Sequence, residues 1–354
     1  MEALEIATPV APQPKRRRAL STVLRLAVSI ALIAWLLRRT DFREVLAAFR
    51  SADPRLIVAA ALLIPLGYLC SVFRWRALLR SQGGDAPLSF LIRSLMTGIF
   101  FNNLLPSTIG GDAIRAWDTS RAGVSRATAV TIVVVDRFVG LLALVLFAAV
   151  GLLISGRLTE RVPDLYGWVL GGTAVMALIA ALLFLPSRRA PDLLAKLGRS
   201  LPGRWGALPG KIGAALFAFQ GKGRVLATAF AWSIGLQALV VLNVWTLARA
   251  LHVPIPLPYF FLIMPVALFA MMLPVSINGI GVRENAYAFF FAAFGVTAAA
   301  GVAVAWLDYA LLLLQALAGG AVYAWGRRSP DPSALSSQPF SLSRSRGRAG
   351  EGVS

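Results

Sequence analysis

Ionisable side chains lie inside strongly apolar segments of this sequence, and they are the first candidates for chemistry. Asp136 and Arg137 fall within the apolar segment 127–155, and Asp308 falls within the segment 286–325. Charged groups at membrane depth are costly, and they usually mark substrate or proton pathways. We interpret these groups as functional or as ion pairs that fasten helices, and the two interpretations are compatible because a gate is often an ion pair.

Two similar Pro/Gly motifs follow shortened apolar segments. Residues 105–115 read LPSTIGGDAIR and residues 273–283 read LPVSINGIGVR, so that Leu, Pro, Ile, Gly and Arg match at a shift of 168. Beyond the motifs the shift becomes 172, and Asp136 then corresponds to Asp308. The shared order of these landmarks predicts an internal duplication, with repeat motifs at 88–137 and 259–309.

Paired interruptions of this kind are the best sequence indication of a transporter's binding site. Broken backbone is tolerated at membrane depth only beside protein or a watery cavity, and helix N-termini there offer free N–H groups to an anion. The alternative is that both motifs are surface loops. The candidate substrate-binding residues are Asn102, Asn103, Gly110, Gly111, Asp112, Arg115, Asp136, Arg137, Asn278, Gly279, Gly281, Arg283, Glu284 and Asp308, and the candidate helix breakers are Pro106 and Pro274.

The composition indicates which elements must position these residues. Hydrophobic residues make up 58% of the 354 residues and charged residues 14%, against about 25% charged in an ordinary soluble domain. We therefore predict an all-α polytopic membrane protein. One cysteine, Cys70, and one histidine, His252, exclude a disulfide framework and a multi-histidine metal site. The net charge of +19 suits anionic lipid headgroups, and we expect no nucleic acid partner.

Apolar length predicts about six full spans and two shorter segments. The candidate spans are 19–37, 56–75, 127–155, 165–185, 230–247 and 286–325, the last broken by Gly295, and an amphipathic interfacial helix is expected within 41–55. We expect a disordered basic cytoplasmic tail at 1–18, a transmembrane domain at 19–326, a basic cytoplasmic loop at 186–224 and a disordered cytoplasmic tail at 327–354.

The distribution of basic residues favours re-entrant hairpins. If every apolar segment crossed, the loop 186–224, with eight cations and one acid, would fall outside, against the positive-inside rule. If 88–121 and 259–294 are re-entrant hairpins, this loop and both tails become cytoplasmic, and the two hairpins enter from opposite faces as an inverted repeat. The loop 38–55, with five arginines, is the weak point because it then falls outside.

No enzyme signature is present, and we expect that the protein is not an enzyme. The sequence lacks G-x-S-x-G, P-loop, H-E-x-x-H and dinucleotide-binding patterns. An intramembrane transferase that uses Asp112 and Asp136 is the alternative. We expect no cofactor and no metal ion.

The same residues resemble the transmembrane region of lysylphosphatidylglycerol synthases, a flippase-like family, over roughly residues 20–328. The resemblance rests on the run from Phe73 to Arg76, on Asn102 to Arg115 with its Gly-Gly-Asp, on Asp136 to Gly140, and on Pro274 to Glu284. Family members often have Glu-Arg in place of Asp136-Arg137. The full-length synthases carry a soluble aminoacyl-transfer domain after the membrane region, which is not expected to fit in this chain.

What the resemblance implies is transport of an anionic, phosphate-bearing or modified lipid between the leaflets of a bacterial inner membrane. Membrane lipids are then the expected partners. The lipid, the direction, the energy source and the oligomeric state stay open. The alternatives are an accessory membrane subunit for a partner glycosyl- or aminoacyl-transferase, and the intramembrane transferase.

Overall fold

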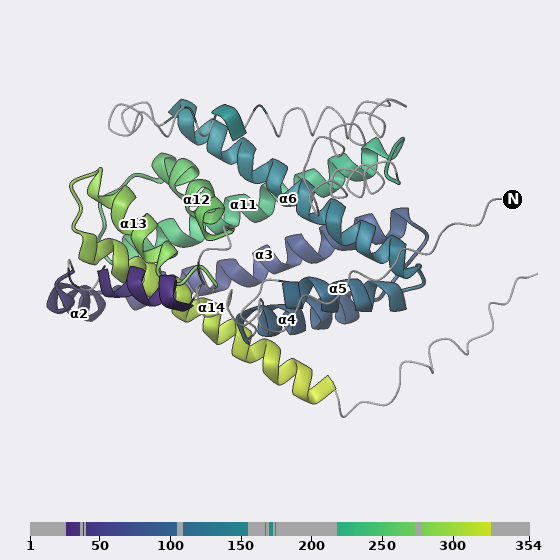
Figure 1. Cartoon of the computed structure of the whole chain (residues 1–354), viewed down its shortest axis with the longest axis horizontal. Coiled ribbons are helices and arrows are strands. Elements are labelled where there is room, and N and C mark those ends of the chain that lie inside the picture. The colour runs from purple at the N-terminus through teal and green to yellow at the C-terminus, as the bar shows by residue number, and fades with distance from the viewer. Residues whose placement is uncertain are drawn as a thin grey trace, which may run out of the picture.

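The computed structural model of the chain describes residues 26–35, 38, 40–104, 109–154, 167, 170–172, 174, 218–272, 276 and 278–326. All regular secondary structure in these ranges is helical (Figure 1). The helices are α2 (Phe42–Arg50), α3 (Pro54–Ser81), α4 (Leu88–Leu104), α5 (Ile109–Arg121), α6 (Arg126–Ile154), α11 (Gly223–Ala250), α12 (Leu257–Met272), α13 (Val282–Ala292) and α14 (Ala298–Gly326).

Four of the described helices, α3, α6, α11 and α14, are long and apolar enough to cross a membrane. α3 and α11 have 28 residues each, which corresponds to about 42 Å of helix against a hydrocarbon core of about 30 Å. Large apolar side chains on these helices are exposed, among them Leu62, Leu153, Leu314 and Leu317. An apolar outer surface of this kind identifies a membrane protein.

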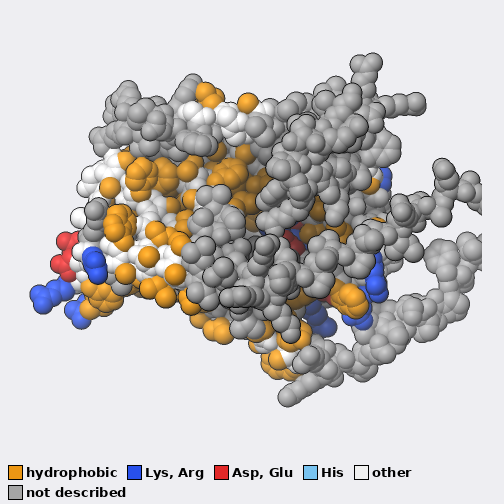
Figure 2. All heavy atoms as spheres, viewed as in Figure 1, with side chains coloured by type: hydrophobic (Ala, Val, Ile, Leu, Met, Phe, Trp, Pro, Cys, Tyr) orange, Lys and Arg blue, Asp and Glu red, His pale blue; other side chains and the backbone are white. Residues whose placement is uncertain are grey.

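The charged side chains lie mainly at the two ends of the long axis. In Figure 2 hydrophobic side chains cover much of the visible middle, and Lys and Arg gather toward the ends. At one end, Arg80 on α3 donates two hydrogen bonds to Asp85, with N–O distances of 3.0 and 3.2 Å. These bonds hold the pKa of the Asp85 carboxyl below its usual value. At the other end, Asp41 is the N-cap of α2, and its carboxylate accepts a hydrogen bond from the Arg43 N–H at 2.8 Å.

The interfacial segment predicted at 41–55 forms a shorter helix, α2, followed directly by α3. Ser51 ends α2, and Asp53 caps α3 by accepting a hydrogen bond from the Arg55 N–H, with Pro54 as the first helical residue. Val45 is buried, and the ring of Phe42 lies 5.7 Å from that of Trp306 on α14. The amphipathic face of α2 is therefore partly used for packing against α14.

The predicted duplication comprises four helices in each half. In both halves a long helix is followed by two short helices and a second long helix, α3 to α6 in the first half and α11 to α14 in the second. α3 and α11 have the same length and begin at Pro54 and Gly223, a shift of 169. The final helices begin at Arg126 and Ala298, a shift of 172. Residues can therefore be matched between the halves.

The two halves pack with approximate two-fold symmetry. α3 and α11 lie against one another, α4 of the first half packs on α14, and α12 of the second half packs on α6. Glycines permit these close crossings: a Cβ at Gly319 on α14 would lie 2.2 Å from the Met96 carbonyl oxygen on α4. A Cβ at Gly151 on α6 would lie 2.5 Å from the Leu262 nitrogen on α12. The first helix of each hairpin thus packs on the last helix of the other half, and the second helix packs on the last helix of its own half.

The hairpins enter the bundle from opposite ends. α3 and α11 are antiparallel, because the Asp53 N–H at the start of α3 donates to the Ala250 carbonyl at the end of α11, at 2.9 Å. Since each hairpin follows its long helix directly, α4 starts at one end of the pair and α12 at the other. In Figure 1, α4 and α5 occupy the right half and α12 and α13 the left half. With 17, 13, 16 and 11 residues, the hairpin helices span about 17–25 Å each, less than the hydrocarbon core of about 30 Å.

Several sequence predictions lie outside the described residues. They are the tails 1–18 and 327–354, most of the basic loop 186–224, nearly all of the span 165–185, and both helix breakers, Pro106 and Pro274. Of the first predicted span, 19–37, the structure describes a short apolar helix at Leu26–Trp35. The predicted segment 286–325 is divided as expected near Gly295, which has a φ of 72° between α13 and α14.

Candidate functional site

A charged triad lies at the contact of α3, α5 and α6 in the first half. Asp136 on α6 is fully buried. It accepts hydrogen bonds from Arg74 Nε at 2.7 Å and Nη2 at 3.1 Å, and from Arg115 Nη1 at 3.1 Å. Arg74 also donates to the Ser233 hydroxyl on α11 at 2.9 Å. The two-pronged contact from Arg74 and the single contact from Arg115 fix three helices of this half around one carboxylate.

Aromatic and hydroxyl groups support the triad. The Arg115 guanidinium lies 4.7 Å from the centroid of Trp75, a distance at which a cation interacts with the ring. The Trp75 Nε1–H donates to the Thr119 hydroxyl at 3.1 Å. A Cβ at Gly140 would lie 3.3 Å from Arg74 Nη1, so the guanidinium fills the space beside α6. The first-half site is therefore closed around its own side chains.

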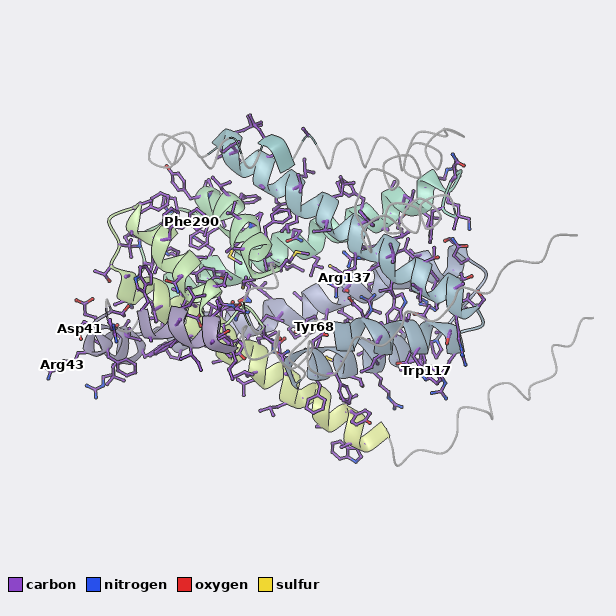
Figure 3. The ribbon with its side chains drawn as sticks, in the orientation of Figure 1. Asp41, Arg43, Tyr68, Trp117, Arg137 and Phe290 are labelled. Carbon is purple, nitrogen blue, oxygen red and sulfur yellow. The ribbon has the colours of Figure 1, made fainter. Side chains whose placement is uncertain are left out.

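A second ion pair joins the start of α5 to α6. Arg137 donates to Asp112 from Nη2 at 2.6 Å and from Nε at 3.1 Å. In Figure 3 Arg137 lies near the middle of the long axis, whereas Trp117 lies toward the end. The side chain of Arg137 is 51% exposed, so this pair lies at a boundary of the packed bundle rather than inside it.

The second half places its charges at the contact of α13 and α14. Arg283 Nη1 lies 3.6 Å from Asp308 Oδ2, and Arg283 Nε donates to the Met271 sulfur at 3.4 Å. Glu284 is buried, and it accepts a hydrogen bond from the Gly281 N–H at 2.7 Å, which caps the start of α13. The Arg283 guanidinium also lies 5.1 Å from the centroid of the Tyr309 ring. Arg283 thus pairs with Asp308, whereas the Glu284 carboxylate caps the helix.

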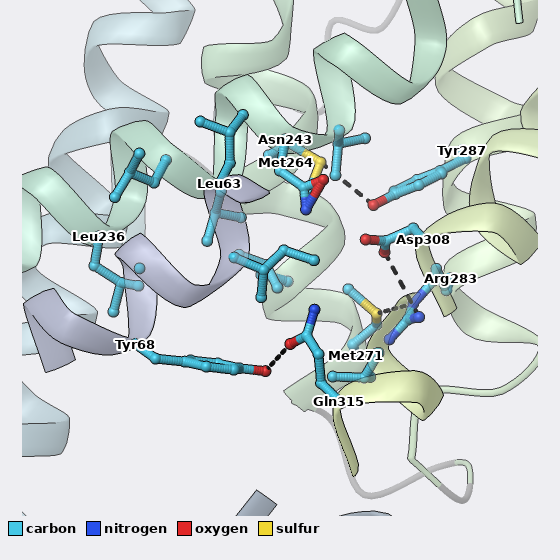
Figure 4. Close-up of a pocket in the computed structure, with 17 residues that line it drawn as sticks. Leu63, Tyr68, Leu236, Asn243, Met264, Met271, Arg283, Tyr287, Asp308 and Gln315 are labelled. Carbon is cyan, nitrogen blue, oxygen red and sulfur yellow. Dashed lines mark hydrogen bonds and ion pairs between the residues drawn. The ribbon is translucent and has the colours of Figure 1, made fainter. Parts of the chain in front are cut away.

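A cavity of about 250 Å³ opens beside Asp308 (Figure 4). Its walls are mainly apolar side chains of α3, α11, α12 and α14, and its polar lining consists of Tyr68, Asn243, Arg283, Tyr287, Asp308 and Gln315. Tyr68 and Gln315 are joined by a hydrogen bond at one side of the cavity. Asn243 Oδ1 and Arg283 Nη1 are buried and have no hydrogen-bond partner among the described residues.

The two broken segments touch one another. The Asn278 side-chain amide donates to the Asn103 carbonyl at 3.2 Å, and within the first hairpin the Gly111 N–H donates to Asn102 Oδ1 at 2.7 Å. Gly111 must be glycine for this approach, since a Cβ would lie 2.5 Å from both the Asn102 amide and the Gly98 carbonyl. The tips of the two hairpins therefore meet inside the molecule.

The second tip is built from residues in left-handed backbone conformations. Asn278, Gly279 and Gly281 have φ values of 52°, 73° and 84°. Glycine adopts such values without steric cost, and asparagine tolerates them better than most residues. These three positions turn the chain from the second break into α13, where Arg283 and Glu284 follow.

The predicted site residues thus form four groups. Arg115 and Asp136 belong to the triad and Asp112 to the pair with Arg137. Arg283 and Asp308 line the cavity, and Glu284 caps the start of α13 beside them. The remaining described positions form the hairpin tips: Asn102, Asn103, Gly110, Gly111, Asn278, Gly279 and Gly281. Within the described ranges, no group of three or more His, Cys, Asp or Glu side chains is placed to hold a metal ion.

Sequence reasoning missed two important polar residues, Arg74 and Asn243. Arg74 lies in the run from Phe73 to Arg76 that carries the family resemblance, and Asn243 lies within the predicted span 230–247. A signal was present for both, because each is a polar residue inside or at the border of a long apolar segment. What the sequence did not show is that they occupy matching positions in α3 and α11.

Comparison with known proteins identifies the family of this chain. Residues 22–319 match the family described as the lysylphosphatidylglycerol synthase TM region. Glycosyltransferase AglD of Haloferax volcanii is similar, with 26% identity over 345 residues, covering 87% of this chain and 54% of that protein. The chain thus spans about half the length of that relative. A UPF0104 membrane protein of Pyrococcus horikoshii is 23% identical over 307 residues, covering 80% of this chain and 91% of that protein. The match over residues 22–319 shows that this protein belongs to the lysylphosphatidylglycerol synthase transmembrane-region family.

Proposed function

We propose that the protein moves an anionic, phosphate-bearing or modified lipid between the leaflets of the bacterial inner membrane, with both termini in the cytoplasm. The observation that carries this proposal is the contact between Asn278 and Asn103, through which two discontinuous hairpins from opposite ends meet. In transporters built from inverted repeats, substrate sites lie at such meetings of broken helices near the bilayer midplane. The hairpins are re-entrant in this proposal.

Guanidinium N–H groups without a hydrogen-bond partner suit a phosphate. Arg115 Nε and Nη2 and Arg283 Nη1 are buried, and none of these three nitrogens has a hydrogen-bond partner among the described residues. Arg115 and Arg283 occupy matching positions behind the two breaks, at the shift of 168. Guanidinium groups bind phosphate through directed N–H bonds, and Asp136 and Asp308 balance their charge while the site is empty.

Transport of this kind requires no covalent chemistry by the chain. The protein would lower the barrier for a polar headgroup by offering it ion-pair partners at depth, where a charge in hydrocarbon is expensive. The long Lys- and Arg-bearing loop at 186–224 would lie at the cytoplasmic face, among anionic headgroups. We propose accordingly that the protein is a transporter and not an enzyme.

The test is transbilayer movement of fluorescent phosphatidylglycerol and phosphatidylethanolamine in proteoliposomes, measured by quenching of the outer leaflet. We expect the wild-type protein to expose inner-leaflet lipid and Arg283→Ala to abolish this activity. Arg283→Lys keeps the positive charge but loses the two-pronged N–H geometry of the guanidinium, so its rate of lipid movement should lie between those of the wild type and Arg283→Ala. Arg224→Ala, which removes an exposed arginine at the start of α11, is the matched control and should be fully active.

Folding must be separated from function in this assay. Each variant is first required to elute as a single species and to melt cooperatively in detergent. Wild-type lipid movement by a folded Arg283→Ala protein would rule out the assigned site. Absence of movement with every lipid tested, in folded wild-type protein, would rule out the lipid panel as substrates.

A second candidate is an accessory membrane subunit for a glycosyltransferase. It is favoured by the similarity to glycosyltransferase AglD, a protein of which the alignment covers 54%. This candidate predicts that the purified protein moves no lipid and that a transferase copurifies with it. Comparison of lipid extracts before and after gene deletion by mass spectrometry would also detect a missing glycolipid.

A further inference from the structure

The two halves of the protein place the same arginine and the same aspartate at their centres, but only the first half supplies a second arginine. Arg115 and Asp136 match Arg283 and Asp308. Since α3 and α11 have equal lengths and begin at Pro54 and Gly223, Arg74 matches Asn243. Asn243 is shorter than arginine and uncharged. The second half is therefore a copy of the triad from which one cation is missing.

The missing cation leaves a space. Asn243 and Asp308 both line the cavity of about 250 Å³, as do Ile64, which matches Ser233, and Leu312, which matches Gly140. The Asp308 side chain is 20% exposed, whereas that of Asp136 is fully buried. The position that the Arg74 guanidinium fills in the first half is thus open toward the cavity in the second half (Figure 4).

The missing cation also changes the number of partners of the aspartate. In the first triad Asp136 pairs with two cations, Arg74 and Arg115. In the second half Asp308 pairs with Arg283, and no second cation among the described residues lines the cavity beside it. A cationic ligand group in this cavity would supply the second partner of the carboxylate.

We propose that the cavity beside Asp308 binds an ammonium or guanidinium group of a ligand, in the place that the Arg74 side chain occupies in the first half. The cation would pair with Asp308 and would donate to Asn243 Oδ1, the buried acceptor that has no hydrogen-bond partner among the described residues. A proton on Asp308 would cancel the charge, but it would leave the cavity and this acceptor unfilled.

The walls of the cavity suit a cation on an alkyl stem. Leu63, Leu236, Leu239 and Leu268 surround the approach to the carboxylate, and the Tyr68 ring borders the other side. In Figure 4 Tyr287 points its hydroxyl toward Asp308 and Met264, so this phenol orients the carboxylate without adding a cation. The assignment of this cavity as a lipid headgroup site rests on the transport proposed above. Cation binding itself is measured without transport.

The test measures the melting temperature of the purified full-length protein in detergent with millimolar guanidinium or ethylammonium chloride, against sodium chloride at equal ionic strength. At ten times the dissociation constant, we expect a saturable rise of about 3–6 °C that sodium does not produce. Asp308→Asn should abolish the rise. Asn243→Lys, which supplies the cation from the chain itself, should also abolish the response.

The first half offers a positive control. In Asp308→Asn protein, the additional change Arg74→Ala opens the equivalent site between Asp136 and Arg115, and guanidinium should restore stability there. Absence of a rise in the wild type, or a rise that persists in Asp308→Asn, would overturn the proposal.

Two further arms identify the source of the cation. If a lipid headgroup supplies the cation, the melting temperature of the wild-type protein should be higher in nanodiscs of phosphatidylethanolamine than in nanodiscs of phosphatidylglycerol. Asp308→Asn should remove this difference. A response only to the soluble ions assigns the site to a free cation. Lipid movement by a protein that binds no cation would refute this inference alone, and cation binding without lipid movement would rule out transport of the lipids tested while leaving the cation site in place.

Discussion

Replacement of Asp136 by asparagine tests whether the triad is the fastening point of the first half. The substitution keeps the shape of the side chain but removes the charge that holds Arg74 and Arg115. Both guanidinium groups are buried, with relative exposures of 6% each, and they would then face one another across a neutral amide. Removal of one partner from a buried ion pair costs about 3–5 kcal/mol of unfolding free energy.

That cost converts to a measurable shift. At about 2–4 °C for each kcal/mol, the melting temperature in detergent should fall by about 6–20 °C. The matched control is Asp85→Asn. Arg80 donates to Asp85 through the same Nε and Nη2 fork that Arg74 uses on Asp136, but both side chains of the control pair are more than half exposed. Solvent screens the exposed pair, so the control should barely change the melting temperature. Equal shifts for the two variants would refute the role of burial in this reasoning.

Two further predictions concern packing and topology. Gly319→Ala should lower the melting temperature by about 2–12 °C, because overpacking costs about 1–3 kcal/mol and the new Cβ would lie 2.2 Å from the Met96 carbonyl oxygen. Gly235→Ala is the control and should change the melting temperature little, because its Cβ would lie 3.5 Å from the Cys70 sulfur, an ordinary contact distance. An unchanged melting temperature in Gly319→Ala would contradict the close α4–α14 crossing. In a Cys70→Ala background, cysteines at Gln82 and Lys222 should react with an impermeant thiol reagent from the cytoplasmic face, and cysteines at Ser51 and His252 from the opposite face. Labelling of Gln82 and Ser51 from the same face would contradict the proposal that α3 spans the membrane.

The sequence alone indicated the duplication and the positions of the breaks, because these depend on local chemistry. Clustered Pro and Gly residues disfavour a continuous helix, and apolar length indicates a span before any packing is known. The short helices on either side of each break, α4 with α5 and α12 with α13, therefore lie where the apolar segments and motifs predicted them.

The partners of the charged residues could not be predicted in the same way. The sequence predicts ion pairs that fasten helices but does not select the partner of Asp136; the structure pairs it with Arg115 and with Arg74, which is 62 residues away in sequence. That choice depends on how α3 packs against α6 and α11. The cavity beside Asp308 depends equally on tertiary structure, because the match between Arg74 and Asn243 is visible only once the ends of α3 and α11 are aligned.

The meeting of the two hairpin tips is the central claim, and a cysteine cross-link between positions 103 and 278 tests it most directly. The experiment is performed in native membranes with Cys70→Ala, Asn103→Cys and Asn278→Cys, using a short bifunctional thiol reagent and a protease site in the intervening loop. A pair at Gln82 and Ala218, where the glutamine amide donates to the alanine carbonyl at 3.1 Å, is the positive control. We predict that the 103–278 pair holds the two fragments together as efficiently as the control. If the hairpins were full spans from opposite faces, their tips would lie about 30 Å apart, and the fragments would separate although the control pair stays linked.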